Sequence, residues 1–565
     1  MSLTLIAVLG IISIVAVTAF STRLGIAAPL SLVVVGVVLS FIPSAPDIAV
    51  EPHIILGGVL PPLLYSAALN MPAQDFRRNI KAITGLAVVL VALTTVVSGA
   101  LLHWVMPEID WPMAFAIGAV ISPTDAVAAT SIGKRLGLPP RIVTMLEGEG
   151  LVNDASALVL LRSAIAAVAV SVSILDVVWD FVLAVLIAAV IGFAVAFVGI
   201  KVRALLPDPV LSTAISFVVP FVAFLPTESL DASGVLAVVV AGVVTGSVGP
   251  AFLGARVRWA ETINWRTVAF LLESSIFLLM GLTIAPLLDE VSDEHLSAGR
   301  AVWIGLLLAV LVIALRLAFV VPLMGLLRRE TRRAAETKPQ VQDWREHPRF
   351  KAGQDNLSPR KQTFIEVRFR RLNADLDFFL SQAVGWRGGL VLGWAGMRGA
   401  ITVAAAQTLP EGTAYRPQLI LIAYVVAITT LLVQGLTIPA VIRVADIPAD
   451  DPARHRADLG RLTTGLTEAG LAALEDSAAP DDVAQRSLEQ ARSAIARRGD
   501  QTAMEDPDAQ QERELYAAYL REALDAQREW LNRAMAGSTY DASVITDGRR
   551  YLDLLEMRLQ DAPQT

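Results

Sequence analysis

Three carboxyl groups lie inside stretches of the chain that are otherwise apolar. Asp125 stands in ISPTDA at 121–126, and Glu149 and Asp154 stand in EGEGLVNDASAL at 147–158. An ionisable side chain at membrane depth costs at least about 2.5–3.5 kcal/mol on insertion scales, so such residues usually mark a path for ions or protons. These acids therefore predict the binding of protons or small cations.

The residues around Pro123 predict a broken helix. Proline inside a helix removes one backbone hydrogen bond and clashes with the preceding turn. Broken backbone at membrane depth is tolerated where it is buried in protein or lines a wet cavity, and transporters build ion sites from such breaks. The Thr124 carbonyl or hydroxyl and the Asp125 carboxylate are then candidate oxygen ligands for Na⁺. The alternative is a proline kink in which Asp125 caps the second half-helix, and the two roles can coexist.

The next apolar span carries Glu149, Asn153 and Asp154. Glu149 and Asn153 are four residues apart and share one helix face, whereas Asp154 is turned by about 100° from Asn153. One carboxylate can then form a structural pair while Asp154 faces an ion path. A carboxyl group in that place holds a proton or a monovalent cation, each excluding the other. In the alternative, the three polar side chains only tie helices together.

Two arginines in apolar spans are candidate partners for these acids. Arg316 lies deep in AVLVIALRLAFVV, and Arg398 lies in the glycine-rich segment GWAGMRGAIT. A lone charge there would be costly, so each arginine is expected to meet a carboxylate or backbone carbonyls. For Arg398, the carbonyls of a broken helix and the acid Glu273 are equal alternatives. Glu273, in AFLLESSIFLLMGL, is expected to be a structural partner rather than an ion ligand.

The composition indicates a polytopic membrane protein. The 565 residues are 55% hydrophobic and 18% charged, whereas soluble domains carry about 25% charged residues. Apolar blocks of about 18–25 residues are long enough to cross a bilayer as helices. We therefore expect an all-α fold with about thirteen spans, at residues 3–20, 25–43, 53–70, 82–106, 112–132, 142–169, 177–200, 209–226, 232–249, 263–285, 299–327, 386–409 and 415–444.

Charges between the spans predict the orientation in the plasma (inner) membrane. Lys and Arg favour the cytoplasmic side, and basic connections alternate with acidic ones along the chain. The N-terminus is therefore expected outside and the C-terminus in the cytoplasm. The transmembrane exchange domain is expected at 1–445, with a basic cytosolic loop at 328–380. An acidic, alanine-rich helical tail at 446–565 is a candidate regulatory domain, with its ligand or partner open.

Several kinds of chemistry are excluded by residue type. Cysteine is absent, and the five histidines form no HxxxH or HExxH pair. Disulfides, thiol catalysis and most zinc chemistry are therefore not expected. Because no nucleophile–base pair or phosphate loop is visible, we expect a secondary active transporter rather than an enzyme, with no cofactor and no nucleic-acid partner.

The motifs SPTDA, EGEGLVNDASAL and GMRGAI, in this order on such spans, resemble the first monovalent cation–proton antiporter family, which holds the bacterial and animal sodium/proton exchangers. The resemblance covers about 1–445. It implies a homodimer with inverted repeats, two crossing interrupted helices and an elevator-like movement. By motif, Asp154 is the implied ion-binding carboxylate with Thr124 and Asp125 beside it, and Asn153 in place of an aspartate resembles the electroneutral branch. Glu149 matches an acid that relatives pair with an arginine, here Arg316.

Two positions depart from the family pattern. Many relatives have a serine directly after the motif glutamate, where this chain has Gly150. Relatives also often carry an acid after a PPxLF-like run, where PPLLYS places Ser66. The first departure leaves the ion preference open, and the second removes a secondary acidic contact.

The sequence favours electroneutral exchange of Na⁺ or Li⁺ for H⁺, with both ions competing for Asp154. The first alternative is exchange of K⁺ for H⁺. A cation channel or an ion-coupled symporter is less favoured, because neither a repeated pore loop nor a ring of selectivity carbonyls is visible. A third interpretation is a membrane-bound sensor whose tail signals to a partner.

Overall fold

The computed structural model describes residues 3–42, 51–169, 174–291, 296–347, 358–447, 452–475, 477, 482–497, 509–537 and 540–560. In these ranges the regular elements are helices, and an isolated β-bridge joins Asp125 to Met397. The predicted all-α fold is therefore confirmed. Eight helices of the described chain are long and apolar enough to cross a membrane, so the count of about thirteen spans stays a prediction.

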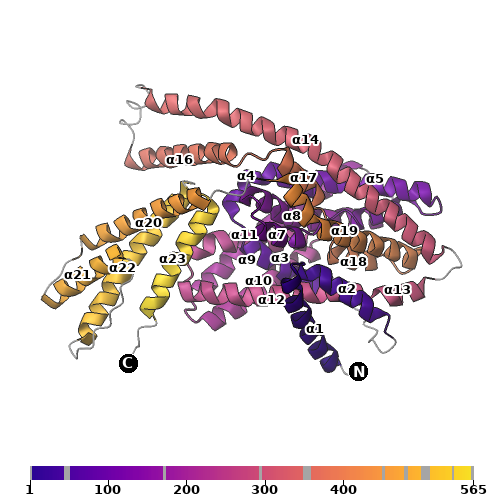
Figure 1. Ribbon diagram of the computed structural model, residues 1–565, viewed down its shortest axis with the longest axis horizontal. Helices are drawn as coiled ribbons and strands as arrows, with labels where there is room; N and C mark the ends of the chain where they lie inside the picture. The colour runs from indigo at the N-terminus through magenta and orange to yellow at the C-terminus, as the bar shows by residue number, and fades with distance from the viewer. Residues whose placement is uncertain are drawn as a thin grey trace. The chain divides into compact units, whose positions relative to one another are not determined.

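The first half of the described chain, whose elements Figure 1 shows by label, supplies all four of the shorter apolar helices, and five of the eight long apolar helices begin in it. In order, its elements are α1 (Leu3–Leu24), α2 (Ala28–Ser40), the π-helix η1 (Ile54–Val59), α3 (Leu60–Leu69), α4 (Ala73–Thr84), the π-helix η2 (Gly85–Val89), α5 (Leu90–Val105), α6 (Trp111–Val120), α7 (Val127–Arg135), α8 (Pro140–Ala169), α9 (Ile174–Ala204), α10 (Pro209–Ser229) and α11 (Gly234–Val248).

The second half contains the longest helix and the C-terminal bundle (Figure 1). Its elements are the 3₁₀ turn η3 (Gly249–Ala251), α12 (Ala255–Leu282), α13 (Ile284–Glu290), α14 (Ala298–Glu346), α16 (Pro359–Ser381), α17 (Trp386–Trp394), α18 (Ala400–Gln407), α19 (Arg416–Ala445), α20 (Pro452–Glu475), α21 (Asp482–Arg497), α22 (Ala509–Ala536) and α23 (Ala542–Gln560).

Two of the predicted spans are interrupted. The span expected at 112–132 is divided between α6 and α7, and the span expected at 386–409 is divided between α17 and α18. The backbone N–H of Asp125 donates to the Met397 carbonyl at 2.6 Å, which joins the two interruptions directly. Pro123 explains the first break, because proline cannot continue the hydrogen-bond ladder of a helix.

The connection expected at 328–380 is largely helical in its described residues. Helix α14 continues to Glu346, and α16 begins at Pro359, while 348–357 lie outside the described residues. The segment is rich in Arg, Glu, Gln, Lys and Ala, which are strong helix formers, and this composition explains its helices. The Phe364 side chain is 66% exposed, and Leu376 and Phe378 are the buried residues of α16.

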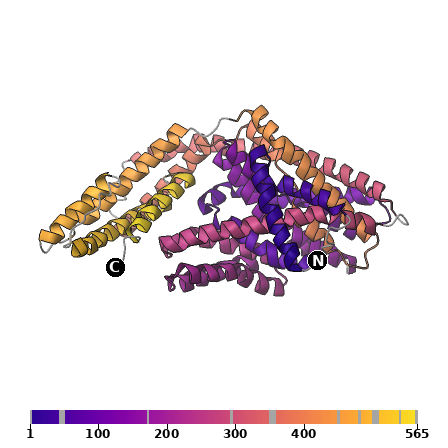
Figure 2. The same cartoon turned by 60° about the horizontal axis from the view of Figure 1, so that its bottom comes forward.

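The chain divides into two compact units, which are described separately. The first comprises Met1–Leu253, Ala260–Arg328 and Val384–Ala449, and the second comprises Gly254–Trp259, Arg329–Ala383 and Asp450–Thr565. In the second unit, α20–α23 lie side by side, as Figures 1 and 2 show. Two clusters of buried apolar residues hold them together, one among α20, α22 and α23 and one among α20, α21 and α22.

Helices of the first unit approach one another closely at glycines. A Cβ atom on Gly118 of α6 would lie 2.3 Å from the Thr95 carbonyl oxygen of α5, and one on Gly246 of α11 would lie 2.1 Å from the Leu69 carbonyl oxygen of α3. Small residues allow such contacts between membrane helices. These contacts bring α6 close to α5 and α11 close to α3.

Candidate functional site

The connection between α6 and α7 turns its polar groups toward α8. Ser122 donates its hydroxyl to the Ala119 carbonyl at 2.8 Å and so caps the end of α6. The Asp125 carboxylate accepts from the backbone N–H of Val127 at 2.8 Å and caps the start of α7. Asp125 thus has the capping role that the sequence allowed, and its second carboxylate oxygen is not used by this cap.

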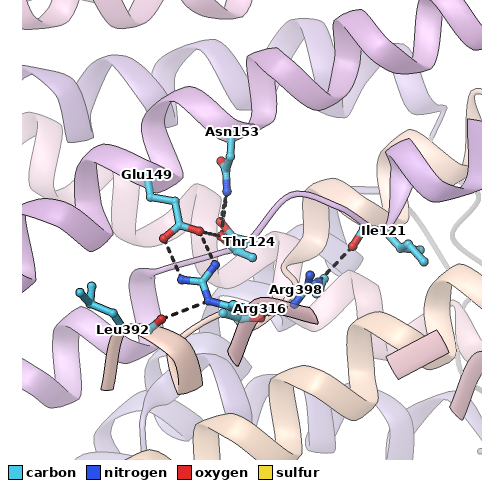
Figure 3. Close-up of polar contacts among 8 residues, drawn as sticks. Ile121, Thr124, Glu149, Asn153, Arg316, Leu392 and Arg398 are labelled. Carbon is cyan, nitrogen blue, oxygen red and sulfur yellow. Dashed lines mark hydrogen bonds and ion pairs between the residues drawn. The ribbon is translucent and has the colours of Figure 1, made fainter. Parts of the chain in front are cut away.

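Asn153 on α8 supports the broken backbone at Thr124. Its amide donates to the Thr124 carbonyl at 2.7 Å and to the Thr124 hydroxyl at 2.9 Å (Figure 3). Asn153 is fully buried, and its carbonyl oxygen has no partner among the described residues. Both Thr124 oxygens, of which the sequence predicts the carbonyl or the hydroxyl as a cation ligand, thus accept a hydrogen bond from Asn153.

Glu149 forms a buried ion pair with Arg316 of α14. Arg316 contacts both carboxylate oxygens, with Nη2 to Oε2 at 2.8 Å, and the two side chains are only 2% and 1% exposed. The Thr124 hydroxyl donates to Glu149 Oε1 at 2.7 Å, and Arg316 Nε donates to the Leu392 carbonyl of α17 at 3.1 Å (Figure 3). Glu149 therefore links α8, α14 and both interrupted helices, and its oxygens are occupied.

Arg398 meets backbone carbonyls and not Glu273. Its Nε donates to the Ile121 carbonyl at 3.0 Å (Figure 3), and its Nη1 donates to the Gly396 carbonyl at 2.5 Å. Both carbonyls belong to the interruptions, where helix ends leave acceptors unpaired. Of the two alternatives, the pairing with Glu273 is wrong. Glu273 is half-buried on α12 and has no hydrogen bond or ion pair with another described residue.

Asp154 differs from the other motif acid on the same helix. It is 5% exposed, and no described residue donates a hydrogen bond to its carboxylate. Among the described residues no three acids or histidines lie close enough together to hold a metal ion by themselves, so a cation here also needs carbonyl, hydroxyl or water oxygens.

Three glycines of the site lie beside functional side chains or backbone, and they differ in how much space a side chain would have. A Cβ atom on Gly399 would lie 2.5 Å from Asp125 Oδ2, and one on Gly396 would lie 2.2 Å from the Arg316 Cδ atom. At Gly150 the nearest atoms would be 3.7–3.8 Å away and include the Thr124 carbonyl oxygen, so a side chain fits there. Ser66, the second departure from the family pattern, is buried and donates to the Trp265 carbonyl at 3.5 Å.

The sequence predicted backbone carbonyls as possible partners of the arginines, but it did not identify which carbonyls these are, nor the contribution of α19. The carbonyls of Ile121, Leu392 and Gly396 hold the two arginines, and the Arg398 N–H donates to the Thr430 hydroxyl at 3.2 Å. Residue types do not reveal which carbonyls a break sets free. The polar residues of α19 did carry a signal, because they recur at helical spacing in an apolar span.

Comparison with known proteins gives a consistent result. The family model described as sodium/hydrogen exchanger, transmembrane, matches residues 9–444. An uncharacterised Na⁺/H⁺ exchanger of Mycobacterium tuberculosis is 29% identical over 573 residues, which cover 98% of this chain and 96% of that protein. The low-affinity Na⁺/H⁺ antiporter NhaS1 of Synechocystis is 29% identical over 430 residues, which cover 75% of this chain and 71% of that protein.

A third relative and a solved structure extend the comparison. A sodium, potassium, lithium and rubidium/H⁺ antiporter of Bacillus pumilus is 32% identical over 302 residues, covering 52% of this chain and 45% of that protein. The structure of the sodium proton antiporter MjNhaP1 from Methanocaldococcus jannaschii at pH 8 matches with a TM-score of 0.51 and 17% identity, covering 77% of this chain and 96% of that chain. At this identity the likeness concerns the fold.

The family model covers well over half of the chain, and the first two relatives cover most of it. The resemblance inferred from the motifs is therefore confirmed, and so is the assignment to secondary transporters rather than enzymes. The chain belongs to the sodium/hydrogen exchanger family, whose members are cation/proton antiporters of membranes.

Proposed function

We propose that this protein exchanges Na⁺ or Li⁺ for H⁺ electroneutrally by alternating access, with the cation and the proton competing for the carboxylate of Asp154. The observation that carries the proposal is the contrast on α8. Both oxygens of Glu149 are held by Arg316, whereas the buried carboxylate of Asp154 receives no hydrogen bond from the described residues. A buried carboxyl in that situation lowers its free energy by binding a proton or a cation.

The neighbours of Asp154 support a cation site beside the interruption of α6 and α7. Asp125 supplies the second carboxylate, with one oxygen on the Val127 N–H and one not used by that cap. Thr124 supplies a carbonyl that accepts from Asn153, and an oxygen with two lone pairs can accept this bond and still face a cation. Hard cations prefer such oxygen ligands.

Asn153 supports the electroneutral stoichiometry. Its amide is uncharged and holds Thr124 in place, so α8 offers one titrating carboxyl beside the cation instead of two. One proton released per monovalent cation bound then leaves the net charge of the site unchanged.

Exchange of K⁺ for H⁺ is the second candidate. It is favoured by one relative, which is named as an antiporter of sodium, potassium, lithium and rubidium. Gly150 also leaves space beside the Thr124 carbonyl, and this space suits a larger cation or a water molecule.

The proposed assembly follows the family resemblance. We infer a homodimer with inverted repeats and an elevator-like movement of the helices that carry the site, in the plasma membrane with the N-terminus outside and the C-terminus in the cytoplasm. The described part of the tail at 446–565 forms a helical bundle of its own, which supports a cytosolic regulatory domain. The basic charges of 328–346 and 359–381 support a cytoplasmic position for these helices.

The function is tested with purified protein in proteoliposomes that carry a pH gradient. Wild type is expected to dissipate the gradient when Na⁺ or Li⁺ is added, and Asp154→Asn is expected to abolish this response. Glu147→Gln is the matched control, because Glu147 lies on the same helix in an exposed pair with Lys134. Normal exchange by Asp154→Asn would refute the assignment. Clamping the membrane potential with valinomycin is expected to leave the rate unchanged, and a voltage-dependent rate would refute electroneutrality.

A further inference from the structure

Helix α19 presents a row of polar side chains to the interruption between α17 and α18. The Thr430 hydroxyl accepts from the Arg398 N–H at 3.2 Å, and the Thr437 hydroxyl accepts from the Trp394 indole N–H at 2.8 Å. Residues spaced by four and three positions share a helix face. Gln434 lies between these two threonines, so it faces the same segment of the interrupted helix.

Gln434 is the unexplained member of this row. Its side chain is fully buried (0% exposed), and neither its amide nitrogen nor its amide oxygen has a partner among the described residues. Buried amide groups are nearly always hydrogen-bonded, because they lose their contacts with water on burial. An amide with these properties indicates a polar contact that it makes during function.

The end of α17 offers the complementary groups. The last carbonyls of a helix have no partner within the helix. At this end, the Val391 carbonyl accepts from the Ala395 N–H at 2.9 Å, and the Leu392 carbonyl accepts from Arg316 Nε at 3.1 Å. The carbonyls of Gly393 and Trp394 follow in the same turn, and no described residue donates to them.

We propose that Gln434 is a positioning residue for the ion site. Its amide N–H groups bond the terminal carbonyls of α17, directly or through one water molecule, and so fix residues 395–399 against α19. That segment supplies the Met397 carbonyl, which holds the backbone of Asp125, and it carries Arg398, which holds Ile121. Gln434 thereby sets the distance between Asp125 and Asp154 without touching the cation. The effect on transport rests on the function proposed above.

The test replaces the amide by an apolar group of similar size, in Gln434→Met. Since one hydrogen bond is typically worth about 1 kcal/mol, the apparent KM for Na⁺ is expected to rise about fivefold, with a smaller change in the maximal rate. Gln418→Met is the matched control, because Gln418 is also buried on α19 but lies four turns away near its start. The control is expected to keep the wild-type KM. A KM of Gln434→Met equal to that of the control would overturn the proposal.

A second measurement does not depend on transport. The chain has no cysteine, and Ala395 in the interruption is 1% exposed, so Ala395→Cys gives a single buried thiol. Maleimide is expected to label this thiol faster when Gln434→Met is added, and no faster when Gln418→Met is added. Equal labelling rates would overturn the proposal. Faster labelling in a protein that shows no cation exchange would uphold the role of Gln434 and refute the proposed function.

Discussion

Glu149 and Asp154 stand five residues apart on α8, yet their carboxylates meet different surroundings. Glu149 is enclosed by Arg316 and the Thr124 hydroxyl, and Asp154 has no hydrogen-bonding partner in the described chain. Helical geometry is the reason, because five residues turn a side chain well away from the first one. The same geometry places Asn153 beside Glu149, where both meet Thr124.

The ion pair of Glu149 and Arg316 gives a prediction for stability. Glu149→Gln leaves a buried guanidinium without its counter-charge, and removal of one partner of such a pair typically costs about 3–5 kcal/mol. The measurement is thermal unfolding of the purified protein in detergent. Adding Arg316→Met to Glu149→Gln is expected to recover part of the loss, because the uncompensated charge is removed. Glu147→Gln, in the exposed pair with Lys134, is expected to change stability by about 1 kcal/mol or less.

At this scale the sequence revealed the acids and arginines but not all of their partners. The types of Asp125, Glu149 and Arg316 were conspicuous because charges are rare in apolar spans. The partners of Arg398 are carbonyls, and every residue has one, so the sequence left the choice between carbonyls and Glu273 open. Only the positions of the helix ends decide it.

The interrupted helices act as a pair at the scale of elements. The hydrogen bond from Asp125 to Met397 joins their breaks, and Arg398 reaches across to the Ile121 carbonyl. Each break thus supplies acceptors for groups on the other. Pro123 predicted the first break, whereas the glycines around Arg398 were only compatible with the second. The sequence did not predict the length of α14, because charged residues can continue a helix as readily as they form a loop.

The close approach of the two breaks is tested with a pair of glycine variants. Gly399→Ala places a methyl group 2.5–2.6 Å from the Oδ2 and Cβ atoms of Asp125, so Asp125 must shift, and the exchange rate is expected to fall about tenfold or more. Gly150→Ser meets its nearest atoms at 3.7–3.8 Å and is expected to keep exchange active. Both rates are measured in proteoliposomes. Equal rates for the two variants would contradict the geometry of the junction.

At the scale of the whole molecule, the second unit includes the first residues of α12 together with the tail bundle. Arg258 forms an ion pair with Asp553 of α23, and Arg528 of α22 pairs with Glu556. Burial lowers the pKa of the Arg528 guanidinium and Arg258 lowers it further, while Asp525 and Asp553 act in the opposite direction. The carboxylate of Asp553 therefore offsets repulsion among clustered arginines.

Asp553→Asn is expected to destabilise this unit by about 1–3 kcal/mol, because a charge-assisted contact is lost and the arginines remain close together. The measurement is limited proteolysis of the full-length protein, in which the region 450–565 should be cut faster. Asp547→Asn is the control, since Asp547 lies on the same helix and contacts the exposed Arg550 one turn away. Similar cutting of both variants would show that Asp553 has no special role.

Helix α14 has 49 residues, which correspond to about 74 Å at 1.5 Å per residue, more than twice the hydrocarbon thickness of about 30 Å. Arg316 sits in its first half, so about 45 Å of the helix lies beyond the ion pair. A helix of that length amplifies a small rotation, because a tilt of about 10° around Arg316 would move its far end by about 8 Å. A spin label near Gln340 is then expected to report small motions of α14 at the buried pair.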